Sequence, residues 1–168
     1  ELTLSAKNFI IATGSSSMER PGITVDEKQI VTSTGALSLS EVPKTMLVIG
    51  GGYIGLEMGS VWSRLGTKVT VVEKLDRIVP TMDGEIATEF MKSLEKQGIE
   101  FKLSHKVVAT KSVSKDVEVT MESEKDKKQI KNKFNVVLMS IGRKPNTEEL
   151  NLEKIGVKLN DQQAIEVD

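Results

Sequence analysis

The chain has 168 residues, a net charge of −1, 38% apolar residues and 28% charged residues, which is typical of a globular protein with one core. The nearly balanced charge gives no signal for nucleic acid or a membrane surface, and no apolar run approaches the roughly 20 residues that cross a bilayer. We therefore expect no nucleic-acid partner and no membrane partner. Because there is no cysteine and only one histidine, His105, the sequence excludes disulfides, a thiol nucleophile and the usual zinc ligand sets, and we expect no metal.

The first elements in chain order are two apolar runs separated by a polar segment. Asn8–Gly14, "NFIIATG", predicts a short strand that ends in a glycine turn. The polar residues after it include Pro21 and Gly22, which indicates a connecting segment. Thr45–Gly50, "TMLVIG", is continuously apolar rather than alternating, as expected of a buried parallel strand.

A helix and a second strand follow this buried strand. The pattern predicts a helix over Tyr53–Leu65, with Gly66 in the left-handed conformation that ends many helices. Lys68–Glu73, "KVTVVE", predicts the next strand. Strand, glycine turn, helix and strand together form a βαβ unit.

The second half of the chain predicts one more helix and several strands. Gly84–Gly98 is expected to be an amphipathic helix whose apolar face carries Ile86, Phe90, Met91 and Leu94. Four short segments, "IEFKL", "KVVATKSV", "DVEVTMES" and "KQIKNKF", predict a small antiparallel meander. Asn135–Gly142 returns to a buried parallel strand. The predicted fold class is α/β, a Rossmann-like domain with a parallel sheet, flanking helices and the meander.

Three glycines between the first strand and the first long helix form the pattern G-x-G-x-x-G. Gly50 permits a tight turn, Gly52 lets a pyrophosphate lie against bare backbone, and Gly55 lets the helix pack close to the strand. The helix N-terminus then offers free N–H groups to the phosphates. The motif alone is weak, but here it follows a strand, opens a helix and has an acid 23 residues after Gly50.

Glu73, at the end of the second strand, is that acid. Its carboxylate can accept hydrogen bonds from the adenosine ribose and would repel a 2′-phosphate, so we expect NAD rather than NADP. Lys74 and Arg77 weaken this inference, since either could reach a phosphate. FAD also binds such folds through the same glycine pattern.

Three long stretches resemble one enzyme family. "GGGYIGLEMGSVWSRLGTKVTVVE", "IVPTMDGEIATEFMKSLEKQGIEFKL" and "SIGRKPNTEELNLEKIGV" are similar, in order and spacing, to the dihydrolipoamide dehydrogenases, which are flavin disulfide reductases. The resemblance implies that residues 45–142 are the NAD-binding domain. It implies that residues 1–44 are a partial flank of the FAD domain with a connecting segment, and that residues 143–168 lead back into that domain.

The resemblance also implies the site residues. For NAD it implies the set Gly50, Gly51, Gly52, Tyr53, Ile54, Gly55, Leu56, Glu57, Glu73, Val107 and Gly142. For FAD it implies the turn Thr13, Gly14 and Ser15. Within the NAD set, Glu57 resembles an acid near the nicotinamide carboxamide; the alternative is an ordinary exposed acid in the first helical turn. Tyr53 resembles an aromatic residue that covers the flavin; the alternative is a plain packing role. Val107 matches a position near the adenine that contacts it through backbone.

The departures from the family are as informative. The family's N-terminal flavin fingerprint, its redox-active cysteine pair and its C-terminal His–Glu pair are absent, so we expect an inactive piece of a longer enzyme with no catalytic residues of its own. The resemblance implies a homodimeric parent that reoxidises the lipoyl-bearing acyltransferase of 2-oxoacid dehydrogenase complexes, in the mitochondrial matrix of a eukaryote or the cytoplasm of a bacterium. Another pyridine nucleotide–disulfide reductase and a non-catalytic NAD-binding module stay open as alternatives.

Overall fold

The computed structural model describes residues 2–167, which form two compact units, 17–142 and 2–16 with 143–167. Residues 1 and 168, at the outer ends of the two expected flanks, lie outside the described residues. The larger unit begins earlier than the predicted start of the NAD-binding domain at residue 45. The reason is that residues 17–44, expected as part of the flank and connecting segment, contain a strand that joins the sheet of this unit and a short helix that follows the strand.

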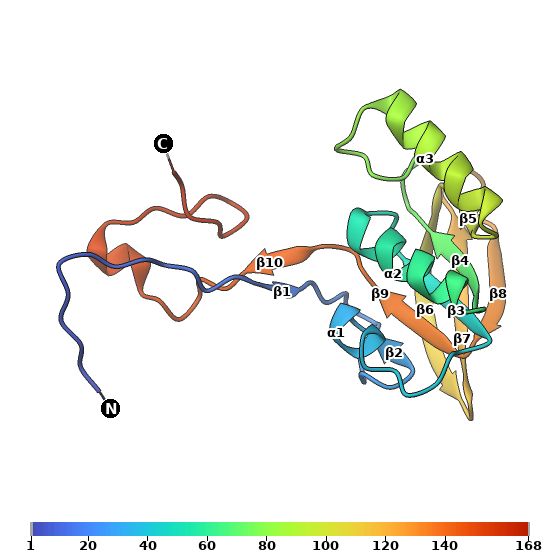
Figure 1. Ribbon diagram of the computed structural model, residues 1–168, viewed down its shortest axis with the longest axis horizontal. Helices are drawn as coiled ribbons and strands as arrows, with labels where there is room; N and C mark the ends of the chain where they lie inside the picture. The colour runs from blue at the N-terminus through green and yellow to red at the C-terminus, as the bar shows by residue number, and fades with distance from the viewer. Residues whose placement is uncertain (1, 168) are drawn as a thin grey trace. The chain divides into compact units, whose positions relative to one another are not determined.

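A five-stranded parallel sheet forms the centre of the larger unit (Figure 1). Its strands are β2 (Ile30–Val31), β3 (Thr45–Ile49), β4 (Lys68–Val72), β5 (Glu100–Lys102) and β9 (Val136–Met139), in the spatial order β2-β9-β3-β4-β5. The expected parallel strands at Thr45–Gly50, Lys68–Glu73 and Asn135–Gly142 are therefore confirmed, each ending slightly earlier than the apolar run.

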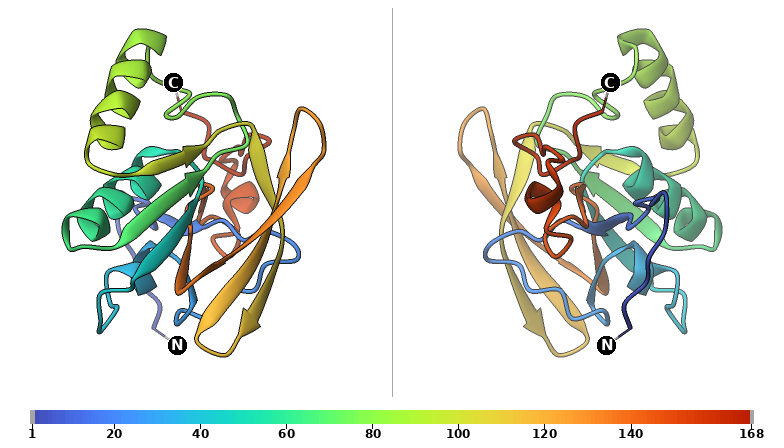
Figure 2. Two further views of the ribbon diagram at one scale, coloured as in Figure 1. Left: turned by 90° about the vertical axis from the view of Figure 1, so that its right-hand side faces the viewer. Right: turned by 90° about the vertical axis from the view of Figure 1, so that its left-hand side faces the viewer.

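Helices cover one face of this sheet. They are α1 (Ser33–Ala36), α2 (Tyr53–Arg64) and α3 (Gly84–Lys96), and Figure 2 shows all of them on the same side. Leu56 and Trp62 of α2 and Leu94 of α3 are buried in a core that also includes Met46 and Val48 of β3. Gly66, with φ 104°, ends α2 in the left-handed region as predicted.

A three-stranded antiparallel sheet covers the opposite face (Figure 2). Its strands are β6 (His105–Val113), β7 (Asp116–Ser123) and β8 (Gln129–Phe134). Leu47 and Ile49, which alternate with Met46 and Val48 along β3, pack in a second core with Met121 from β7. Because both faces of the parallel sheet are covered, its strands are continuously apolar rather than alternating.

Two expectations for this region were wrong in part. The segment "IEFKL" is not in the meander, because β5 pairs in parallel with β4 at the edge of the central sheet. The face of α3 that enters the core carries Ala87, Met91 and Leu94, whereas the side chains of Ile86 and Phe90 are 60% and 37% exposed. The helix is rotated so that the small side chain of Ala87 faces the core.

A two-stranded sheet of β1 (Ser15–Ser17) and β10 (Arg143–Pro145) belongs to the smaller unit except for Ser17, and the same unit contains the 3₁₀ helix η1 (Leu152–Ile155). The strand predicted over Asn8–Gly14 does not form, and Phe9 and Ile10 are exposed. A strand needs a neighbouring strand for its ladder of backbone hydrogen bonds, and within residues 2–167 this segment joins no sheet. None of the helices in the same residues is long and apolar enough to cross a membrane.

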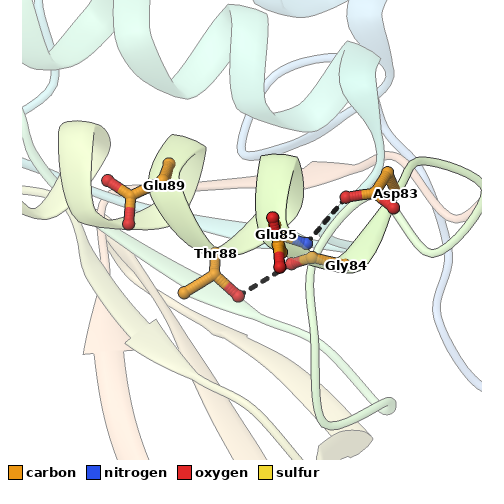
Figure 3. A pocket seen from close by; sticks show the side chains of 5 residues that line it. All are labelled: Asp83, Gly84, Glu85, Thr88 and Glu89. Atoms are coloured by element: carbon orange, nitrogen blue, oxygen red, sulfur yellow. Dashed lines mark hydrogen bonds between the residues drawn. The ribbon is translucent and has the colours of Figure 1, made fainter.

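Helix α3 begins at a side-chain cap. An Asp83 Oδ1 atom accepts hydrogen bonds from the backbone N–H groups of Glu85 (2.9 Å) and Ile86 (3.3 Å). Figure 3 shows this end of the helix, where Asp83, Gly84, Glu85, Thr88 and Glu89 line an acidic pocket. The cap satisfies donors that the first turn would otherwise leave unpaired.

We predict that Asp83→Ala lowers the free energy of unfolding by about 1 kcal/mol, measured by urea denaturation, because two N–H groups lose their acceptor. Asp83→Asn is the control, since its amide oxygen still accepts these bonds. Equal losses in both variants would contradict the capping role and point to the charge instead.

Candidate nucleotide site

The carboxyl ends of three neighbouring strands meet at one level of the parallel sheet. Ile49, the last residue of β3, lies opposite both Val72 of β4 and Met139 of β9. The chain segments that leave these strands therefore start side by side. In open α/β sheets, ligands bind at this edge, where the connections from a central strand run to opposite sides.

Gly50 is required by the fold itself. Its φ is 107°, and its N–H donates to the carbonyl oxygen of Val72 (2.9 Å). A Cβ atom at this position would lie 2.5 Å from the backbone oxygen of Ser140, which follows β9. The turn after β3 is thus packed against the end of β9, and no larger residue fits.

Gly51 is held at both its backbone groups. Its N–H donates to Oε2 of Glu73 (2.6 Å), and its carbonyl oxygen accepts from the N–H of Val79 (2.9 Å). A Cβ atom on Gly51 would lie 3.1 Å from Cγ2 of Ile78. Val79 has φ 38°, a left-handed conformation that is rare for a β-branched residue and marks local strain.

Glu73 directly follows β4 and is half-buried. While Oε2 accepts from Gly51, Oε1 accepts from the N–H of Leu75 (2.8 Å). Each carboxylate oxygen keeps a free lone pair, so the fixed pair of oxygens can still accept two hydroxyl donors. Lys74 is exposed, and the guanidinium of Arg77 donates to the carbonyl oxygen of Pro80.

Gly52 differs from the other glycines of the loop. Its φ of −79° suits any residue, and a Cβ atom here would have no neighbouring atom within 4 Å. It is the N-cap of α2, and no side chain caps this helix end. The first N–H groups of α2 are therefore not satisfied by a side-chain cap and can bind an anion.

The other residues of the predicted NAD set that lie on α2 differ in how far they are buried. Gly55 and Leu56 are buried and Ile54 is half-buried, whereas the side chain of Tyr53 is 63% exposed. Glu57 is exposed and lies fifth in the helix, hence in its second turn rather than the predicted first. The buried members can reach a ligand only through their backbone.

Val107 and Gly142 lie in different surroundings. The Val107 side chain is fully buried between the two sheets, where it pairs with Met121. Gly142 has φ 140°, follows Ser140 by two residues, and accepts a hydrogen bond from the N–H of Met18 (3.0 Å). The structure brings the turn that contains Gly142 beside the glycine loop through Ser140, whereas Val107 offers only backbone.

The predicted FAD turn belongs to the smaller unit, where Asn146 holds it. Thr13 Oγ1 donates to the Asn146 carbonyl oxygen (2.7 Å), and the Asn146 N–H donates to the carbonyl oxygen of Gly14 (2.9 Å). The guanidinium of Arg143 donates through Nε to Oγ of Ser15 (2.7 Å). Arg143 and Asn146, in the part of the chain expected to lead back into the FAD domain, are thus connected to this turn by hydrogen bonds in both directions.

Sequence reasoning missed the residues that support the glycine loop from outside the motif. Ser140 and Ile78–Val79 contact the loop, but neither belongs to the G-x-G-x-x-G pattern. Ser140 is 90 residues from Gly50, and serine after an apolar run carries no distinctive signal. Only the parallel register of β3 and β9 brings it there.

The parallel sheet, the glycine loop and the acid after β4 define a Rossmann-like α/β domain. The model of the family described as pyridine nucleotide-disulphide oxidoreductase matches residues 1–168. The chain belongs to this family.

Relatives agree with that assignment. The chain is 56% identical to mitochondrial dihydrolipoyl dehydrogenase of Pisum sativum and 55% identical to leghemoglobin reductase of Glycine max, in both cases over 92% of this chain. These matches cover 31% and 30% of the relatives, so the chain spans about a third of their length. The HOCl-induced flavoprotein disulfide reductase RclA of Escherichia coli matches with a TM-score of 0.80 and 30% identity, over 94% of this chain and 35% of that one. The expected resemblance to dihydrolipoamide dehydrogenases is confirmed.

We predict opposite effects for alanine at two glycines on the same side of α2. At Gly55, a Cβ atom would lie 2.5 Å from the backbone oxygen of Gly50, so Gly55→Ala should destabilise the protein by about 1–3 kcal/mol. At Gly59, the nearest atom, Cγ1 of Val69, is 3.4 Å away. Gly59→Ala should therefore be neutral or stabilise by up to about 1 kcal/mol, through helix propensity. Thermal unfolding of both variants measures this, and a stable Gly55→Ala protein would disprove the close packing.

Proposed function

We propose that this chain is the NAD(H)-binding part of a dihydrolipoyl dehydrogenase. The observation that carries the proposal is Gly52. Backbone conformation and packing account for glycine at position 50, and packing accounts for it at position 55, but neither accounts for it at Gly52. A pyrophosphate lying against the backbone at this point would account for it, because any side chain would occupy the same space.

The surrounding groups fit an adenine dinucleotide. The uncapped N-terminus of α2 presents N–H groups and a partial positive charge to the pyrophosphate. Glu73, fixed by Gly51 and Leu75, accepts the two ribose hydroxyls without losing side-chain freedom on binding. Its negative charge disfavours a 2′-phosphate, and Arg77 does not offset it while it is bonded to Pro80. NAD(H) is the preferred cofactor.

In the proposed whole enzyme, oxidation of the dithiol of dihydrolipoamide to a disulfide releases two electrons and two protons. Bound FAD and NAD⁺ would accept the two electrons and one proton as a hydride, with the second proton released to solvent. The residues of this chain orient the dinucleotide for that transfer. Glu57 positions the nicotinamide carboxamide, Tyr53 covers the flavin, and the backbones of Val107 and Gly142 border the cofactor. Thr13, Gly14 and Ser15 contribute a turn to the FAD site, held in shape by Asn146.

The same resemblance extends to the setting of the whole protein. Its partners are the lipoyl-bearing acyltransferases of 2-oxoacid dehydrogenase complexes, and it is a homodimer in the mitochondrial matrix of a eukaryote or the cytoplasm of a bacterium. The relatives from Pisum sativum, Arabidopsis thaliana and Schizosaccharomyces pombe are named as mitochondrial. A reductase with another substrate remains the second candidate, since leghemoglobin reductase is equally similar.

We predict that Gly52→Ser separates binding from folding. Serine is a good N-cap residue and meets no neighbour here, so the melting temperature should stay the same or rise. Its side chain would enter the space proposed for the pyrophosphate, so calorimetric affinity for NADH should fall at least about tenfold. A variant that binds NADH as tightly as the wild type would disprove the proposed position of the pyrophosphate.

We predict that Glu73→Arg shifts cofactor preference toward NADPH. Loss of hydrogen bonds to a charged acceptor should weaken NADH binding about ten- to a hundredfold, and arginine adds a partner for the 2′-phosphate. Because Glu73 also holds Gly51, part of the loss affects both cofactors, and the NADH-to-NADPH affinity ratio is the proper measurement. Glu95→Arg, an equal charge change at an exposed position on α3, is the control. An unchanged ratio would mean that Glu73 does not bind the ribose.

A further inference from the structure

Ser140, the first residue after β9, contacts the glycine loop through its side chain. Its Oγ lies 2.9 Å from the carbonyl oxygen of Ile49 and 3.4 Å from that of Gly50, and it can donate to either. Its own N–H also donates to Ile49 (2.9 Å). This half-buried serine therefore links the ends of β3 and β9 by a side-chain hydrogen bond, in addition to the backbone hydrogen bonds between the two strands.

The hydroxyl fills the space between the loop and the first turn of α2. A Cβ atom built on Gly55 would lie 2.5 Å from Ser140 Oγ and 2.5 Å from the carbonyl oxygen of Gly50. The three groups are therefore in close contact. A change in the size or polarity of the Ser140 side chain acts directly on the start of the helix.

The peptide unit between Gly50 and Gly51 is held from both sides. Its carbonyl oxygen faces Ser140 Oγ, while its N–H donates to Glu73 Oε2 at 2.6 Å. In a trans peptide the C=O and N–H groups point in opposite directions, so these partners fix the rotation of the whole plane. The peptide unit between Gly51 and Gly52 is fixed in a similar way. Its carbonyl oxygen accepts a hydrogen bond from the Val79 N–H, so the Gly52 N–H points in the opposite direction.

We propose that Ser140 is a positioning residue for the dinucleotide pyrophosphate. The inference rests on the proposed NAD(H)-binding function. The hydroxyl has one proton to share between the carbonyl oxygens of Ile49 (2.9 Å) and Gly50 (3.4 Å). By keeping these carbonyl groups directed toward β9, it keeps the following N–H groups directed toward the phosphates. Without it, the carbonyl of Gly50 loses its side-chain donor and the loop can rotate, so binding must first restore the loop conformation.

The test compares ligands with and without a pyrophosphate on the chain itself. The affinities of NADH, ADP-ribose and adenosine are measured by NMR titration, which detects weak binding, for the wild type and Ser140→Ala. Ser63→Ala is the matched control, because Ser63 Oγ donates to the Gln97 carbonyl oxygen (3.3 Å) at the far end of α2. We expect Ser140→Ala to weaken NADH and ADP-ribose binding by about three- to tenfold, leaving adenosine unchanged.

The outcomes separate this inference from the function on which it rests. If the wild type binds NADH and Ser140→Ala binds it equally well, the positioning role is overturned and the proposed function stands. An equal loss for adenosine, or an equal loss in Ser63→Ala, would also overturn it, because the effect would then not be confined to the pyrophosphate loop. If the wild type binds neither NADH nor ADP-ribose, the proposed function fails and the inference fails with it.

Discussion

The structure depends on the parallel register of β3 with its two neighbours. Because Ile49 lies opposite both Val72 and Met139, the glycine loop, Glu73 and Ser140 all begin from one edge of the sheet. A shift of the register by one residue would turn every side chain of a strand to the opposite face. Because Met46 and Leu47 are buried in different cores, such a shift would exchange the side chains that pack in each core, so core packing bears on the geometry of the candidate site as well.

The glycines of the loop illustrate how one sequence motif combines different constraints. Gly50 and Gly55 allow β3, β9 and α2 to approach one another, and they would be needed with or without a ligand. Gly52 has neither an unusual φ nor a close neighbour. A functional constraint is most visible where structural constraints are satisfied without it, and for this reason Gly52 carries more weight than the motif as a whole.

The sequence predicted the features that short-range patterns determine. The continuous apolar runs identified β3, β4 and β9, and the glycine spacing identified the turn and the start of α2. Long-range pairing was less predictable. Whether "IEFKL" joins β4 or the meander depends on which edge is free, and the run Asn8–Gly14 cannot become a strand without a partner. The rotation of α3 was missed because Ile86 is more apolar than Ala87, although close packing on the sheet favours the smaller side chain. Ser140 has no sequence signal, since its role arises from contacts 90 residues away.

In the proposed site, Glu73 would affect both the shape of the loop and the choice of cofactor. One of its oxygens holds the N–H of Gly51 and the other holds Leu75, so the charge that would repel a 2′-phosphate also fixes the peptide plane of the loop. Replacing the acid therefore changes two properties at once. Ser140 holds the other side of the same plane, and it can preserve part of the loop conformation when Glu73 is changed. In the proposed site, affinity for either cofactor thus depends on the clamped peptide and both of its partners, whereas the preference between NAD(H) and NADP(H) depends on the charge of the acid.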